Sequence, residues 1–107
     1  MTRRVDLASP GAPRVNETQA RALLLVRLLC GPSNEWASVS FRRLAPRVTI
    51  RGSTLRGVIY YLRGVRLLES RAVYLENGGQ LESEYRLTPL GLCVSRELED
   101  KGWQVLG

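Results

Sequence analysis

Apolar residues recur at helical spacing in several stretches of the chain and alternate with polar residues near its middle. The first helical stretch runs from Asn16 to Cys30. Asn16 and Gln19 have the spacing of a capping box, and Gly31-Pro32 ends the helix. Its apolar residues point to nearly every side, which predicts that the C-terminal helix, a partner subunit or both cover its second face.

Residues 48–68 are the most informative stretch, and we interpret them as a turn, a helix and the start of a strand. Ser53 is a good N-cap for this helix because its hydroxyl can accept a backbone N–H of the first turn. An apolar stripe follows at helical spacing, formed by Leu55, Val58, Ile59, Leu62 and Val65. The opposite face carries Ser53, Arg56, Gly57, Tyr60 and Gly64, with Arg63 beside them. The two glycines let a DNA phosphate approach the backbone, pack tightly against a neighbouring helix, or are the product of sequence drift without a role.

The region between these two helices has a weaker pattern. Residues 35–39 predict a very short strand at the edge of the core. A short helix is expected over residues 41–45, and Pro46 ends or kinks it. Residues 48–50 are β-branched and therefore fit a turn better than a helix.

The strand-like part of the chain predicts a β-hairpin. Residues 67–75 are rich in Val, Tyr and Leu, and residues 81–87 alternate between apolar and polar positions. Residues 76–80 contain Asn-Gly and Gly-Gly, which adopt the positive φ that tight turns require. These features place a turn between two antiparallel strands.

The last predicted helix begins at a clear signal. Thr88 caps it, and Pro89 occupies the first helical position, where proline is tolerated. Its apolar side is formed by Leu90, Val94 and Leu98. Gly102 ends the helix, and we expect the apolar tail over residues 103–106 to dock on the protein.

Composition indicates one small globular domain with an uneven charge. We expect a flexible basic arm over residues 1–15, followed by a single domain over residues 16–107. The arm either follows a DNA minor groove or is a disordered terminus. The net charge is +6, with +9 on residues 1–66 and −3 on residues 67–107. This asymmetry fits a protein that presents one side to a polyanion.

Several classes of protein find no support in the residues. No segment is long and apolar enough to span a membrane, and Arg3-Arg4 is not followed by the apolar core of a secretory signal. The chain has no histidine and shows no Gly-rich phosphate loop. We therefore expect no enzyme, no metal and no cofactor. Cys30 and Cys93 are either buried small hydrophobes or a redox-sensing pair.

The predicted order of helix, short strand, two helices, hairpin and helix resembles the winged helix-turn-helix domain over residues 38–91. Residues 85–91, Tyr-Arg-Leu-Thr-Pro-Leu-Gly, look like the Y-x-L-T-x-x-G junction of PadR-like and MarR-like regulators. The resemblance implies an α+β fold with a three-helix core, a β-hairpin wing and a C-terminal helix. The chain departs from the family at Thr49 and Arg66, where glycine is frequent, and at Pro46, and its wing is acidic.

The resemblance also implies sequence-specific binding of double-stranded DNA by a small transcriptional regulator, with the central helix in the major groove. We expect a cytoplasmic, nucleoid-associated homodimer, joined through the first and last helices because these carry surplus apolar residues. The residues expected at DNA are Arg42, Arg43, Arg47, Arg51, Ser53, Thr54, Arg56, Tyr60, Arg63 and Arg71. The alternative is a winged helix that contacts another protein within an assembly, which the acidic hairpin and the apolar first helix favour.

Overall fold

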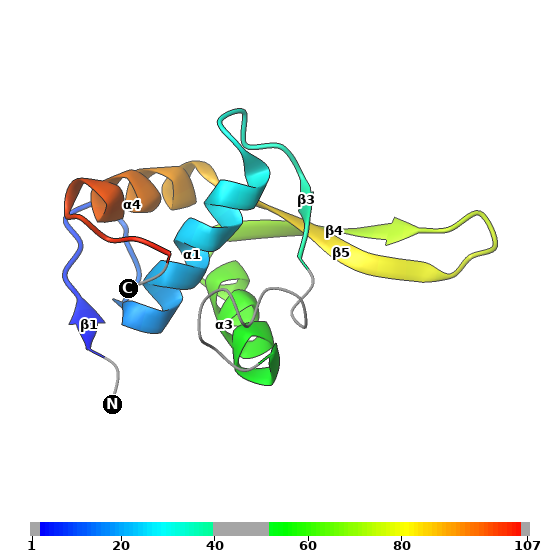
Figure 1. The fold of residues 1–107 in the computed structure, drawn as a ribbon, viewed down its shortest axis with the longest axis horizontal. Helices are drawn as coiled ribbons and strands as arrows, with labels where there is room; N and C mark the ends of the chain where they lie inside the picture. The colour runs from blue at the N-terminus through cyan, green and yellow to red at the C-terminus, as the bar shows by residue number, and fades with distance from the viewer. Residues whose placement is uncertain (1–2, 40–51, 106–107) are drawn as a thin grey trace.

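In the computed structural model the chain is an α+β protein, with three helices and two small antiparallel sheets among the residues described (Figure 1). The structure describes residues 3–39 and 52–105, and of residues 52, 53 and 80–82 it describes the backbone alone. The elements follow in the order β1 (Arg4–Val5), β2 (Val15–Asn16), α1 (Glu17–Cys30), β3 (Ala37–Ser38), α3 (Gly52–Gly64), β4 (Leu68–Tyr74), β5 (Gln80–Leu87) and α4 (Pro89–Asp100). The helix predicted over residues 41–45 and the turn over 48–50 lie outside the described residues.

Helix α1 begins and ends where the sequence predicts. The Asn16 Oδ1 accepts the Gln19 N–H at 2.8 Å, and the Gln19 Oε1 accepts the Asn16 N–H at 2.9 Å, which completes the capping box. Gly31 follows the last turn with a φ of 72°, a conformation that favours glycine. The chain's own α3, α4 and β5 pack around the helix. Leu28 is its one large apolar side chain that stays mainly in solvent, 61% exposed.

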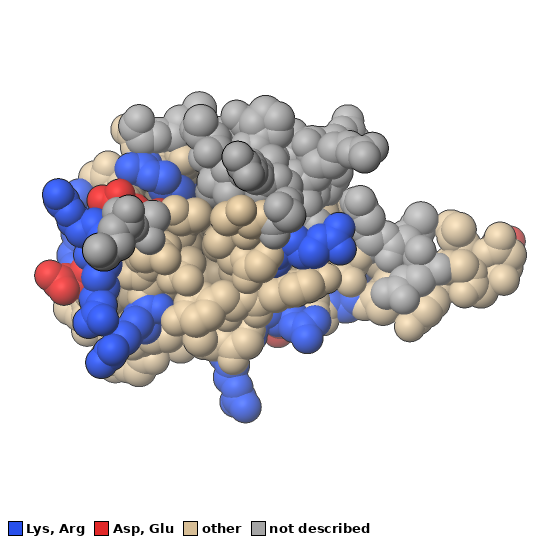
Figure 2. Space-filling model, turned by 90° about the horizontal axis from the view of Figure 1, so that it is seen from below, with Lys and Arg blue, Asp and Glu red and all other residues tan. Residues whose placement is uncertain are grey.

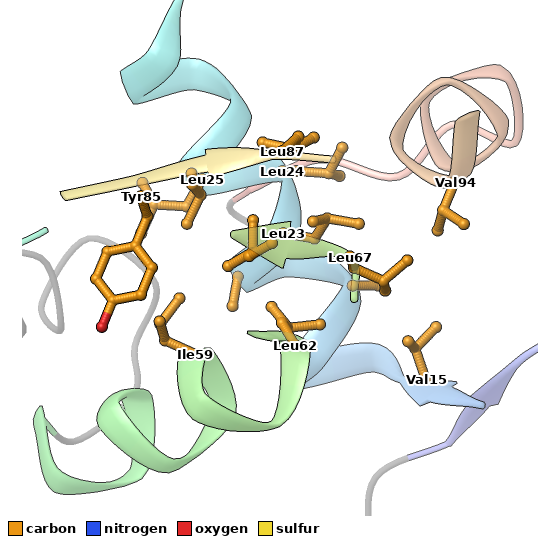
Figure 3. Close-up of a cluster of buried hydrophobic side chains, with 14 of the residues drawn as sticks. Val15, Leu23, Leu24, Leu25, Ile59, Leu62, Leu67, Tyr85, Leu87 and Val94 are labelled. Carbon is orange, nitrogen blue, oxygen red and sulfur yellow. The ribbon is translucent and has the colours of Figure 1, made fainter. Parts of the chain in front are cut away.

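The core lies between α1, α3 and the β4–β5 hairpin (Figure 3). Its fully buried side chains include Leu23 and Leu25 of α1, Ile59 and Leu62 of α3, and Leu87 of β5. Burial of each such side chain stabilises the fold by roughly 1.5–3 kcal/mol. The apolar periodicity of the sequence therefore corresponds to the faces that hold these elements together.

The larger sheet has the strand order β3-β5-β4, and both pairs are antiparallel. Tyr85 on β5 lies opposite Ser70 on β4 and opposite Ala37 on β3. Tyr85 and Leu87 point into the core, with 3% and 1% of their surface exposed. The hairpin and the short strand predicted from the sequence are therefore confirmed, and the hairpin projects well beyond the helices (Figure 1).

Helix α4 starts in close contact with the segment that links α3 to β4. The Thr88 Oγ1 accepts the Gly91 N–H at 3.0 Å and donates to the Arg66 carbonyl at 2.5 Å. The Thr88 N–H donates to the Leu67 carbonyl at 3.1 Å. A Cβ on Gly91 would lie 2.0 Å from the Leu67 carbonyl oxygen, so the position requires glycine. Arg66 has a φ of 65°, which explains physically why glycine is favourable at that position.

Residues 3–16 differ from the flexible arm that the sequence predicts. They include β1 and β2, in which Arg4 lies opposite Asn16 and Val5 lies opposite Val15. Both valines belong to the core, with 7% and 2% of their surface exposed. Two isolated valines have no periodicity, so the local sequence carries no signal that this segment packs on the domain.

Glu97 of α4 holds the N-terminal segment through its carboxylate. It accepts the Ser9 hydroxyl at 2.6 Å, the Ala8 N–H at 2.6 Å and the Ser9 N–H at 2.7 Å. Lys101 forms an ion pair with the same carboxylate at 2.9 Å and donates to the Asp6 carbonyl. The Ser9 hydroxyl, followed by the Ala8 N–H and Lys101, lowers the pKa of Glu97 from 4.5 to about 2.

We predict that Glu97→Gln lowers the unfolding temperature at neutral pH, and that the deficit relative to wild type shrinks on acidification. A carboxylate with a lowered pKa stabilises the fold above its unfolded pKa near 4.5, and this contribution is lost as the pH falls toward about 2. Thermal unfolding followed by circular dichroism between about pH 7 and pH 2 measures the difference. Glu76→Gln, at the exposed end of the hairpin, removes the same charge as a control. A deficit that stays constant over this range would contradict the assignment.

The C-terminal tail docks as the sequence predicts. Trp103 and Val105 are partly buried against the core. The Arg21 guanidinium stacks on the Trp103 ring, 5.0 Å from its centroid, and its Nη1 donates to the Gln104 carbonyl at 2.7 Å. Together with α1, α4 and Pro32, this tail borders an apolar groove of about 350 Å³ on the surface.

Candidate nucleic-acid interface

Helix α3 has one buried and one exposed side, as its sequence predicts. The fully buried residues of its stripe are Leu55, Ile59 and Leu62, and Val58 and Val65 are partly buried beside them. Arg56, Tyr60 and Arg63 face outward, and half of the Tyr60 surface is exposed. A helix anchored by its apolar side thus carries two guanidinium groups and an aromatic ring on its exposed side.

Of the remaining residues predicted to contact DNA, some lie in the part of the chain that the structure describes and others lie outside it. Thr54 is exposed in the first turn of α3. The helix already begins at Gly52, so Ser53 is its second residue and not the predicted N-cap. The apolar pattern fixes the side of the helix that is buried but not its first residue, which explains this error. Four predicted phosphate contacts lie outside the described residues: Arg42, Arg43, Arg47 and Arg51.

Gly57 and Gly64 lie on the exposed side of α3. Apart from the chain neighbours and the backbone of α3 itself, no atom of the described residues lies within 4 Å of the position that a Cβ would take at either glycine. Tight packing against a neighbouring helix, one of the three explanations that the sequence leaves open for them, is therefore not observed among the described residues. Within the described part of the chain, nothing covers the α3 backbone at these two positions.

The edge of α3 that faces the hairpin carries contacts that sequence reasoning missed. The Arg63 Nη1 donates to the Ser70 Oγ at 3.3 Å. Tyr85, which lies opposite Ser70, is buried beneath the helix, and burial raises the pKa of its hydroxyl. The nearby Tyr60 raises this pKa further, while Arg63 and Arg56 oppose the shift. The alternation of β5 predicts that Tyr85 points inward, but nothing in the sequence indicates which α3 residues it meets.

The outer face of the sheet carries a network of charges around Trp36. The Arg71 Nε pairs with the Glu84 Oε1 at 2.8 Å, and Arg86 pairs with Glu69 across the same two strands. The two guanidinium groups lie 4.7 and 4.4 Å from the centroid of the Trp36 ring. The charges of the network cancel. Arg71, predicted to contact DNA, would therefore have to exchange Glu84 for a phosphate.

The ion pairs between described residues are distributed unevenly over the surface. The ion pairs among the described residues are Arg27–Glu99, Arg71–Glu84, Arg86–Glu69 and Lys101–Glu97. All involve α4, its C-cap or the outer face of the sheet. The molecule seen from the side of α3 shows many Lys and Arg side chains and few acidic ones (Figure 2). An excess of one sign on one face attracts a polyanion and accelerates its association.

Three further features of the described residues concern membrane-spanning helices, metal sites and cysteines. No described helix is long and apolar enough to cross a membrane. Within the same residues, no group of three or more Cys, Asp or Glu side chains has an arrangement that could hold a metal ion. Both cysteines are free thiols; Cys30 is buried and Cys93 is exposed. Burial raises the pKa of the Cys30 thiol, which makes it a poor nucleophile.

Comparison of the chain with protein families, with curated proteins and with solved structures found no match.

Proposed function

We propose that the protein binds double-stranded DNA through the exposed side of α3 and acts as a small transcriptional regulator. The observation that carries this proposal is the pair of guanidinium groups, Arg56 and Arg63, that flank Tyr60 on an exposed helix face whose opposite side is locked into the core. Arginine can pair bidentately with guanine O6 and N7 in the major groove and also binds phosphate.

The proposed fold is a winged helix-turn-helix. Its support is the order of α1, β3, α3, the hairpin and α4, with β3 paired to the returning strand of the hairpin. The junction motif supplies further support, since Tyr85 and Leu87 are buried, Thr88 caps α4, and Gly91 permits its close approach to Leu67. The helix that would precede α3 in this fold falls within residues 40–51, outside the described residues.

In the proposed complex α3 lies in the major groove. Base edges and nearby phosphates meet Ser53, Arg56, Tyr60 and Arg63, while Arg42, Arg43, Arg47 and Arg51 hold the DNA backbone and fix the register. A homodimer would place two such helices about one helical turn apart on paired half-sites. The exposed Leu28 and the groove beside Trp103 supply apolar surface for the dimer predicted from α1 and α4. A cytoplasmic, nucleoid-associated location follows from this proposal.

The test is binding of a labelled random-sequence duplex at increasing salt, followed by selection of bound sequences from a random duplex library. Four to six phosphate contacts per subunit predict that log K falls with log salt at a slope of roughly −4 to −5. Enrichment of a defined motif in the selection would establish sequence specificity. Binding that is absent at low salt, or that ignores salt, would contradict the proposal.

The end of the hairpin favours a second candidate, a winged helix that contacts another protein. Tyr74 and Leu75 are 66% and 45% exposed there, and the acidic Glu76 follows them. Exposed apolar side chains at a projecting tip are typical of a protein-binding surface. This function predicts no salt-sensitive binding of the random duplex, so the same titration separates the two candidates.

A further inference from the structure

A polar pocket lies where the N-terminal segment meets the start of α1 and the flank of α3. Its volume is about 350 Å³, and its lining residues are Arg4, Arg14, Val15, Asn16, Gln19 and Tyr61. The pairing of β1 with β2 creates it, because Arg4 lies opposite Asn16 and Arg14 directly precedes β2. The Tyr61 hydroxyl donates to the Arg14 carbonyl at 2.6 Å, which fastens this segment to α3.

The pocket offers hydrogen-bond donors and positive charge. Asn16 and Gln19 use their side-chain oxygens in the capping box, so that their amide NH₂ groups are left to donate. Arg4 and Arg14 are exposed and form no ion pair with any carboxylate in the described part of the chain. Two guanidinium groups with two amide donors match the acceptor oxygens of a phosphate, which guanidinium binds by paired N–H···O bonds.

The pocket adjoins the proposed DNA-binding face. Successive residues of an α-helix are rotated by about 100°, so Tyr61 follows Tyr60 around α3 on the flank away from Arg56 and Arg63. Gly57 lies between these flanks, where no described atom covers it. Basic side chains also gather at the end of this face where the N-terminal segment lies (Figures 1 and 2). The pocket therefore lies beside the exposed side of α3, at the end that holds the N-terminal segment.

We propose that this pocket binds a backbone phosphate of the DNA duplex that α3 contacts, with Arg4 and Arg14 as the phosphate ligands. The inference rests on the proposed function and extends its footprint to the N-terminal segment. Tyr61 is a positioning residue, because it holds the Arg14 backbone while its hydroxyl proton is already donated. The segment acts here as a clamp of fixed structure, since Val5 and Val15 anchor it in the core.

The experiment measures binding of a labelled random-sequence duplex by wild type, Arg4→Ala/Arg14→Ala and Arg4→Lys/Arg14→Lys. We expect the alanine variant to bind about tenfold more weakly near 0.1 M salt, with a salt slope shallower by about 1 to 2. The lysine variant keeps both charges and restores most of the slope. Arg96→Glu changes the net charge by the same amount on α4, on the other side of α1 from α3 (Figure 1), and is expected to change the slope little. Equal unfolding temperatures establish that every variant is folded.

Each outcome decides the proposal. If Arg4→Ala/Arg14→Ala binds as wild type does while Arg56→Ala/Arg63→Ala binds more weakly, the pocket proposal is wrong and the α3 proposal stands. If wild type itself fails to bind the duplex, both are wrong. The last measurement is binding of inorganic phosphate by calorimetry. If the alanine variant loses phosphate binding but keeps its duplex affinity, the pocket binds a free anion and the proposal is wrong.

Discussion

Gly91→Ala is expected to destabilise the protein by about 3 kcal/mol, because the new Cβ would lie 2.0 Å from the Leu67 carbonyl oxygen. The obstacle is backbone, which cannot rotate away as a flexible side chain can. It is also held in place, since Thr88 donates its N–H to Leu67 and its hydroxyl to Arg66. Relief of the clash therefore requires α4 to move and break these bonds. For a domain of this size the unfolding temperature should fall by about 10–20 °C.

The control for Gly91→Ala is Gly57→Ala, the same substitution in the interior of α3. Beyond its chain neighbours and the backbone of α3, no described atom lies within 4 Å of its Cβ position, and alanine is the better helix former, so we expect stabilisation by about 0.5–1 kcal/mol. Both substitutions restrict the unfolded chain equally, so the difference between them isolates the contact with Leu67. Thermal unfolding by calorimetry measures both. A Gly91→Ala protein as stable as wild type would disprove the requirement for glycine at this junction.

The same junction shows which parts of the fold could be predicted from the sequence. Thr88 and Pro89 predict the start of α4 correctly. A helix cap and a first-turn proline depend only on residues that are close in the sequence, so the sequence alone shows them. Asn16 and Gln19 predict the start of α1 for the same reason. The helical stripes and the alternation of β5 are equally local, since each reports the one side of an element that is buried. Local chemistry thus predicts the described helices and the hairpin to within a few residues.

The parts that could not be predicted depend on residues far apart in the sequence. Glu97 holds Ala8 and Ser9 through hydrogen bonds between residues almost ninety positions apart, which no local pattern predicts. The sequence alone therefore predicts a flexible arm at the N-terminus. The sequence predicts Arg71 as a DNA contact because it does not show that Arg71 pairs with Glu84. Charge identity is visible in a sequence, whereas the partner that neutralises a charge is a property of the fold.

These pairings change how the basic residues are ranked as DNA ligands. An arginine that already has a carboxylate must give it up before it binds a phosphate, which reduces the net gain on binding. Arg71 and Arg86 are in this position on the outer face of the sheet. Arg63 is bonded to the neutral Ser70 hydroxyl, so its charge is not cancelled by that contact. In the proposed complex, Arg63 is therefore a stronger DNA ligand than Arg71 or Arg86 on the sheet face.

Arg56→Ala/Arg63→Ala is expected to weaken binding of a duplex by roughly 2–6 kcal/mol, which is about 30-fold or more, if each arginine contributes about 1–3 kcal/mol. Both side chains are exposed on α3, so their removal leaves the buried stripe of the helix intact. Fluorescence anisotropy with the sequence selected from the random library measures the loss. The single variants separate two roles. An arginine that reads a base loses affinity for the selected sequence and relaxes its preference, whereas a phosphate contact loses affinity equally on every sequence.

Arg71→Ala is the matched comparison for Arg63→Ala, because both remove one positive charge from exposed side chains near the hairpin. Arg71 neutralises Glu84, so we expect its loss to reduce duplex affinity only slightly, by the long-range effect of one screened charge. Arg63→Ala removes a guanidinium that faces the DNA in the proposed complex, and its effect should be clearly the larger. Equal losses for the two variants would mean that net charge alone drives binding. A larger loss for Arg71→Ala would instead place the DNA on the outer face of the sheet, around Trp36, and remove α3 from the interface.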